Sequence, residues 1–200
     1  MTTEFLALVT VAAGRWPEHG DDPPPRPIAG FVLSSFSPLA AEAADRCLRR
    51  VYGDPPAEPT RGRRTAVVIS SRSGDVATAA ALAEAVDDGR RVPPLLFFQA
   101  VPNAVAGHIA ARWGLGGPVV CLSPAGDAAA EALSAAALLI HDGDADEALV
   151  LLVELAELEV ERPERETERE TARDGATAGD GATARDGATA LLVRPGTPEE

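Results

Sequence analysis

Short apolar runs alternate along the chain with longer segments in which apolar residues recur at helical spacing. The runs that favour strands are Phe5–Ala13, Thr65–Ser70, Val119–Ser123, Ala148–Leu155 and Ala188–Arg194. The three central runs are apolar at consecutive positions, which is typical of strands buried on both faces of a parallel sheet. The alternation of these strands with helical segments predicts an α/β fold, in which helices pack on the faces of a sheet.

Helical spacing predicts one helix that begins at Pro38 and ends before Gly53, and two more over Val76–Asp87 and Gly126–His141. The segment Ile28–Phe36 fits either a second short strand or an extended lead-in to the first helix.

Composition divides the chain into residues 1–161, 162–187 and 188–200. The first part is one folded domain with a proline-rich, exposed connection at residues 15–27. Toward its end the second part enters three hexads, ARDGAT, AGDGAT and ARDGAT, the last of which overlaps the start of the third part. These would form about one coil of a hexapeptide β-helix, which is too few to stack, so a flexible or frayed insertion is the favoured interpretation. The third part is a final strand and tail, and we expect this strand to pair antiparallel with Ala148–Leu155 across the expanded loop.

The formal net charge of −13 argues against a nucleic-acid partner, because an acidic protein repels phosphate backbones. The acidic run Glu154–Glu170 is interpreted as a solvated face or tail. The chain has no lysine, which excludes a Schiff-base lysine and a phosphate-loop lysine. No apolar run approaches the roughly 18 residues of a membrane span, and the start carries no basic leader, so we expect a cytoplasmic protein without membrane contact. Cys47 and Cys121 are expected to be buried free thiols.

An ordered series of short motifs runs from Pro94 to Glu154. Its members are Pro94 and Phe97, then Asn103, Ala106, Gly107, Ile109 and Ala110, then Gly114, Leu115, Gly117 and Pro118, and finally Gly143, Ala145 and Asp146. The order and spacing resemble the N-terminal domain of β-ketoacyl synthases, a family of the thiolase superfamily, and in particular its chain-length-factor-like members. The segment Thr65–Asp75 is similar to the second strand of that family and the turn after it.

The resemblance implies a thiolase-like half for residues 1–161, with a mixed five-stranded sheet and helices packed on its faces. The physical properties of the motif residues agree with it. Gly114 and Gly117 before Pro118 indicate a turn that needs a positive φ or a close approach of the backbone. Asn103 could cap a helix that begins near Ala104, and Gly107 would give that helix a small-residue face.

In active members of the family, a cysteine follows the strand that here is Val119–Ser123, at the start of the next helix. Gly126 occupies the matching position in this chain. The same resemblance implies that Val119, Val120, Cys121, Leu122 and Ser123 form the strand that pairs with its twin across a dimer interface. Cys121 would then point into the core or into that interface, so an inert structural thiol is favoured over a displaced nucleophile. Cys47, on the apolar face of a helix, is interpreted in the same way.

The catalytic histidines of the family come from a C-terminal half, and the histidines of this chain do not replace them. His19 lies in the proline-rich loop, His108 is expected on a helix surface, and His141 is expected at a helix C-terminus. The run Asp142–Asp146, DGDAD, hints at calcium but lacks the spacing of an EF-hand and matches the family's turn instead. We expect no catalytic residues, no cofactor and no metal.

The functional expectation is a non-catalytic β-ketoacyl-synthase-like subunit that acts as a partner or chain-length-factor-like protein in fatty-acid or polyketide biosynthesis. A full-length ketosynthase, an acyl carrier protein and a second copy of this chain are the expected partners. Two alternatives stay open. One is an acyltransferase or condensing enzyme whose residual activity a partner chain completes, and the other is a degenerate binding module.

Overall fold

The computed structural model describes residues 7–156 and 186–196. The strands are β1 (Leu8–Trp16), β2 (Thr65–Ser70), β3 (Val119–Leu122), β4 (Glu147–Glu154) and β5 (Gly187–Pro195). The helices are α1 (Phe36–Tyr52), α2 (Pro59–Gly62), α3 (Val76–Asp87), α4 (Pro94–Gln99), α5 (Pro102–Trp113) and α6 (Ala128–His141). Most of the predicted insertion, residues 162–187, lies outside the described residues, as does most of the acidic run.

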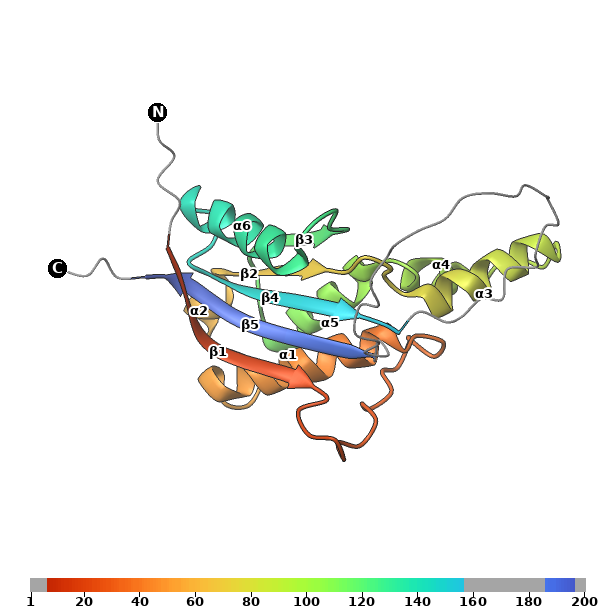
Figure 1. Ribbon diagram of the computed structural model, residues 1–200, viewed down its shortest axis with the longest axis horizontal. Helices are drawn as coiled ribbons and strands as arrows, with labels where there is room; N and C mark the ends of the chain where they lie inside the picture. Colours follow the sequence, from red (N-terminus) through yellow and green to blue (C-terminus); the bar gives the residue numbers. More distant parts are fainter. Residues whose placement is uncertain (1–6, 157–185, 197–200) are drawn as a thin grey trace, which may run out of the picture.

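The five strands form one mixed sheet in the order β1-β5-β4-β2-β3 (Figure 1). Strands β3, β2 and β4 run parallel, whereas β5 is antiparallel to both β4 and β1. The predicted antiparallel pairing of the last strand with its predecessor is confirmed, with Leu149 opposite Leu192 in the register. Asp186 closes the base of the intervening loop, because its Oδ1 accepts the backbone N–H of Ala156 at 2.7 Å.

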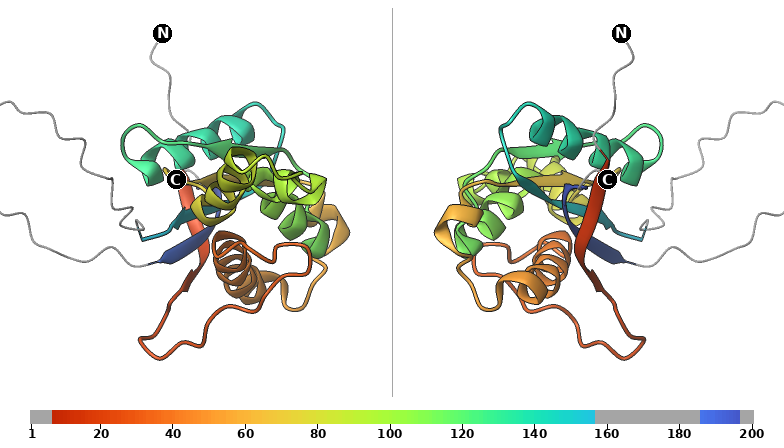
Figure 2. Two further views of the ribbon diagram at one scale, coloured as in Figure 1. Left: turned by 90° about the vertical axis from the view of Figure 1, so that its right-hand side faces the viewer. Right: turned by 90° about the vertical axis from the view of Figure 1, so that its left-hand side faces the viewer.

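Helices cover both faces of the sheet, and the two faces bury separate cores (Figure 2). Helices α1 and α5 pack on one face, where Phe36, Leu48 and Trp113 are fully buried. Helix α6 packs alone on the other face through Ala132 and Ala136, against alternate residues of β2 and β4. Consecutive residues of β2 and β4 therefore face different cores, which is why both strands read as uninterrupted apolar runs. The expected mixed sheet with helices on its faces is confirmed.

A buried carboxylate anchors the start of β4 to the elements beside it. Glu147 is only 5% exposed, and its oxygens accept hydrogen bonds from Tyr52, Thr65 and Arg61. The Arg61 Nη2 to Glu147 Oε2 distance is 2.7 Å, and the Arg61 guanidinium also lies 4.8 Å from the centroid of the Tyr52 ring. The anchor joins the end of α1, the α2 region and the sheet.

The glycine-rich turn before β3 has the predicted geometry. Gly114 ends α5 in the left-handed conformation, with φ at +66°. A Cβ at Gly117 would lie 2.6 Å from the carbonyl carbon of Thr65, so only glycine fits against the start of β2.

Some sequence expectations are wrong. Ile28–Phe36 contains turns and bends before α1 rather than a strand, which leaves the lead-in interpretation. Asn103 does not cap α5, because Val101 holds the N-cap position and Pro102 begins the helix, as proline at a first helical position often does. Gly107 is exposed, and a Cβ there would meet nothing within 4 Å, so no close packing requires it.

The segment Pro94–Gln99 forms the short helix α4, with Phe97 66% exposed.

Candidate functional site

The elbow that joins β3 to α6, residues 123–127, lies at the carboxyl edge of the parallel strands. Ligand sites of α/β sheets gather at this edge because the loops after parallel strands meet there. The turn after β2 lies beside the elbow, since the Ser71 N–H donates to the Leu122 carbonyl at 3.1 Å. Arg72 in that turn reaches across, and its Nη2 donates to the Gly126 carbonyl at 2.8 Å.

Two carboxylates of the chain itself occupy the hydrogen-bond donors at the start of α6. Asp127 is the N-cap, and its Oδ1 accepts the N–H groups of Ala129 and Ala130 at 2.9 and 3.0 Å. The Gly126 N–H donates to Glu131 Oε1 at 2.6 Å. These are the donors that a helix N-terminus offers to an anionic group.

Any side chain at residue 126 would lie against a negative charge. A Cβ built there is 3.2 Å from Glu131 Oε1. A thiol at this position would therefore lie beside a carboxylate and beside N–H groups that are already hydrogen-bonded. A reactive thiolate is instead stabilised by nearby positive charge or by free hydrogen-bond donors. Backbone N–H groups of the elbow and of the start of α6 therefore bind acidic residues of the chain itself.

Cys121 lies in the middle of β3 and is exposed, so the prediction that both cysteines are buried is wrong for this one. Val120 and Leu122 pack toward α6, and the alternation of the strand turns Cys121 to the opposite face. Its Sγ lies 3.6 Å from Oδ1 of Asn103 on α5. Partial burial raises the pKa of this thiol, which disfavours the thiolate form.

Cys47 and the histidines are not brought to the elbow. Cys47 is fully buried between α1 and the sheet, and burial raises the pKa of its thiol to about 11. His108 on α5 packs edge-on against Phe31, with ring centroids 6.0 Å apart. His141 ends α6 at the far end from the elbow, and His19 lies in the loop after β1.

Within the described ranges, no group of three or more His, Cys, Asp or Glu side chains is arranged to hold a metal ion. In the DGDAD turn, Asp146 pairs with Arg64 at 2.8 Å, which supports the structural interpretation of that motif.

Four buried polar side chains near this edge were not singled out from the sequence. Ser70 Oγ at the end of β2, Asp75 Oδ2 and Thr78 Oγ1 at the start of α3, and Gln99 Nε2 at the end of α4 have no hydrogen-bond partner among the described residues. The sequence signal for these residues was the serine run after the strand and the aspartate before a helix. An aspartate in that place is typical of a helix N-cap. Asp75 does cap α3, because its Oδ1 accepts the Thr78 N–H at 3.1 Å.

Among the described residues, strand β3 is an edge of the sheet, with β2 as its one hydrogen-bonded neighbour. The carbonyls of Pro118 and Leu122 accept from Val67 and Ser71 and so point toward β2 and the turn after it. Because the direction of backbone groups alternates along a strand, those of Val119 and Cys121 point away from β2. An unpaired row of this kind is a template for another strand.

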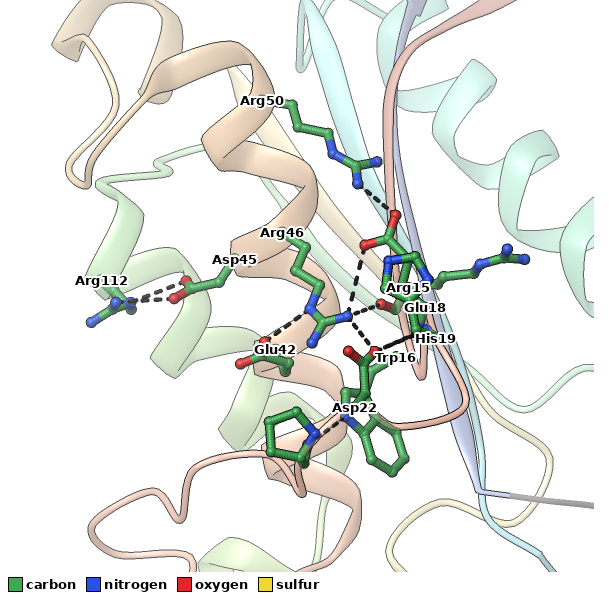
Figure 3. Close-up of polar contacts among 11 residues, drawn as sticks. Arg15, Trp16, Glu18, His19, Asp22, Glu42, Asp45, Arg46, Arg50 and Arg112 are labelled. Atoms are coloured by element: carbon green, nitrogen blue, oxygen red, sulfur yellow. Dashed lines mark hydrogen bonds and ion pairs between the residues drawn. The ribbon is translucent and has the colours of Figure 1, made fainter.

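A second polar cluster fastens the proline-rich loop to α1 (Figure 3). Arg46 is its centre, with Nη1 at 2.7 Å from Asp22 Oδ2 and Nε at 2.9 Å from Glu42 Oε1. Arg50 pairs with Glu18 at 2.7 Å. The hydrogen bond from Arg46 and those from nearby backbone N–H groups lower the pKa of Asp22 to about 2.

Protonation of Asp22 should weaken the attachment of this loop to α1. Because the folded-state pKa of Asp22 lies below its ordinary value of 3.8, its contribution is present above pH 4 and is lost as the pH falls through about 2. We expect the difference in unfolding free energy between wild type and Asp22→Asn to be constant from pH 7 to about 4 and to vanish toward pH 2. Denaturant unfolding followed by circular dichroism measures it. Asp21→Asn, next to it but without these bonds, is the control and should show no such difference. A difference that persists unchanged at pH 2 would contradict the assignment.

Comparison with known proteins places the chain in a well-populated structural group. A sequence model described as the N-terminal domain of β-ketoacyl synthases matches residues 32–195. No curated protein matches the sequence.

Three similar solved structures illustrate the fold. A ketosynthase in complex with its chain length factor, from Xenorhabdus doucetiae, has 18% identity and a TM-score of 0.64, over 96% of this chain and 81% of that one. A type II polyketide synthase acyl-carrier protein in complex with its ketosynthase bound to the hexaketide has 15% identity and a TM-score of 0.66, over 95% and 62%. A β-ketoacyl synthase from Burkholderia phymatum has 22% identity and a TM-score of 0.59, over 80% and 42%.

The likeness confirms the thiolase-like fold of the ketosynthases for this chain, which spans less than two thirds of two of these three structures. Among the described residues, none of the helices has the length and apolar character needed to cross a membrane.

Proposed function

Because the chain belongs to the family of β-ketoacyl synthase N-terminal domains, we propose that it is a non-catalytic subunit of acyl-chain condensation, in fatty-acid or polyketide biosynthesis. It acts as a chain-length-factor-like partner of a full-length ketosynthase. Solved structures with this fold include a ketosynthase with its chain length factor and a ketosynthase with an acyl-carrier protein, and these precedents support the choice of partners.

One observation carries the non-catalytic part of the proposal. By the resemblance, Gly126 matches the nucleophile position of the family, and the structure shows Glu131 and Asp127 accepting hydrogen bonds from the backbone at and beside it. Glycine has no atom that can attack a thioester, and the carboxylates oppose the negative charge that develops during acyl transfer. Cys121 gives the enzymatic alternative little support, because its thiol faces Asn103 and has a raised pKa.

The open edge of β3 supplies the proposed interface with the partner. The backbone N–H of Cys121 points out of the sheet, where an antiparallel strand of another chain can accept it. Val119, 42% exposed, adds an apolar side chain to this edge. The same strand would serve a homodimer, because antiparallel pairing of a strand with its own copy is self-complementary.

Capture of the tagged chain from its native lysate tests the proposal. We expect a full-length ketosynthase and an acyl carrier protein to co-purify and to be identified by mass spectrometry. Cys121→Pro removes the outward N–H at an edge position that tolerates proline within the fold, so we expect about tenfold less ketosynthase to be captured.

The matched control is Cys121→Ser, which keeps the N–H and should retain the complex. Melting temperatures of both variants verify that the fold survives. If neither partner is captured with the wild-type chain, the subunit role is refuted and the degenerate binding module becomes the better account.

A further inference from the structure

A cleft of about 630 Å³ lies between α1, α5 and the proline-rich loop, and we name it the α1 cleft. Its floor is one face of α1, formed by Glu42, Asp45, Arg46 and Arg49 at spacings of three and four residues. Helix α5 forms one wall with residues 108 and 112, and the loop at residues 23–29 forms the other. Gly126 is not among the residues that line it, so the cleft is separate from the elbow.

An ion pair and a hydrogen bond within the protein hold the loop wall in place. Arg46 joins the wall to the floor through Asp22, and the Trp16 Nε1–H donates to the Pro23 carbonyl at 3.1 Å (Figure 3). A cleft with fixed walls loses little entropy when it binds a ligand.

The residues that line the α1 cleft include more arginines than carboxylates, although the protein as a whole is acidic. Four arginines line it, against the two carboxylates of Glu42 and Asp45, in a chain whose net charge is −13. Arg112 donates to Asp45 through Nε and Nη2 at 3.1 and 3.0 Å, which leaves its Nη1 unused among the described contacts. Arg49 pairs with the exposed Asp54 and lies 6.0 Å from the centroid of the Trp113 ring. Guanidinium groups with unused donors are suited to carboxylate and phosphate heads.

Apart from His108, the rest of the lining is apolar. Pro23, Pro24, Pro25 and Pro27 come from the loop wall, and Pro38 and Ala41 come from the first turns of α1. The charged residues Asp45 and Arg49 lie one and two turns further along the helix, so the cleft has an apolar end and a cationic end.

We propose that the α1 cleft binds a small organic anion. The carboxylate or phosphate head lies at Arg49 and Arg112, and an apolar body packs on the proline rings. A volume of about 630 Å³ is within the usual range of small-molecule sites. The proposal does not depend on the condensation role, because the cleft shares no residue with the elbow or with β3.

Titration calorimetry of the full chain at low ionic strength tests this site with benzoate and phenyl phosphate as probes. We expect saturable binding with a dissociation constant on the order of 1 mM, weakened as salt rises. The tighter of the two probes identifies the preferred head group. Benzyl alcohol, which has the apolar body without the charge, should not bind measurably.

Variants locate the binding. Arg49→Gln should weaken it about tenfold, the effect of losing one charge-assisted hydrogen bond. The control Arg90→Gln lies just after α3, away from the cleft, and should bind like wild type. Absence of saturable binding by either anion, or equal affinities in Arg49→Gln and Arg90→Gln, would overturn the proposal.

Discussion

Replacing Gly14 by alanine should destabilise the protein by about 3 kcal/mol, because β1 touches α1 backbone to backbone at this residue. A Cβ at Gly14 would overlap the backbone nitrogen of Cys47 and lie 2.7 Å from the carbonyl oxygen of Ala43. Neither backbone atom can move without shifting α1 away from the sheet. For a chain of this size, the change corresponds to a fall of about 6–12 °C in the melting temperature.

Gly20→Ala is the matched control for this prediction. A Cβ at Gly20 meets nothing within 4 Å, and the residue is exposed, so its melting temperature should match wild type. Differential scanning calorimetry of both variants measures the difference. Equal melting temperatures would show that the approach of β1 to α1 is looser than described.

Replacing Glu147 by alanine should cost a similar amount, about 3 kcal/mol. The substitution removes the buried carboxylate that accepts from Tyr52 and releases Arg61 from its partner, whereas the Thr65 hydroxyl keeps the Arg61 carbonyl as an acceptor at 2.9 Å. Because Arg61 is 43% exposed and can return to water, the loss should lie at the lower end of the range for buried pairs.

The neighbouring Asp146→Ala is the control, since Asp146 is 67% exposed and pairs with a half-exposed Arg64. Exposed ion pairs contribute less than about 1 kcal/mol, so its effect should be small. Denaturant unfolding compares the two free energies of unfolding. Equal effects of the two substitutions would contradict the anchoring role of Glu147.

Elements with strong periodicity were predictable from the sequence. The bounds of β2 and α3 agree with the expectation residue for residue, because β2 is apolar on both faces and α3 lies between an aspartate cap and a glycine. The pairing of β5 with β4 was also predictable, because the chain returns to an apolar, strand-like run after the long polar segment.

The errors have two physical origins. Asn103 is a good capping residue, but the helix begins at Pro102, two positions earlier than expected, which places the asparagine inside the first turn. The exposure of Cys121 depends on β3 being an edge strand, and strand order is a long-range property that local pattern does not report. The sequence shows that acidic residues are present at the elbow. Only the folded geometry shows that they accept hydrogen bonds from Gly126 and the start of α6.

The exposure of an apolar side chain on the outer face of α6 follows from the fold, and the sequence pattern only suggested it. Strand β1 joins the edge of the sheet instead of covering α6, and Leu138 on this helix is 59% exposed.

Intact-mass spectrometry after incubation with acetyl, octanoyl and malonyl thioesters tests the proposed lack of catalysis most directly. With Gly126 at the elbow and its donors occupied by Asp127 and Glu131, the account predicts that the mass of the chain does not change. A stoichiometric acyl adduct that Cys121→Ser abolishes would contradict it.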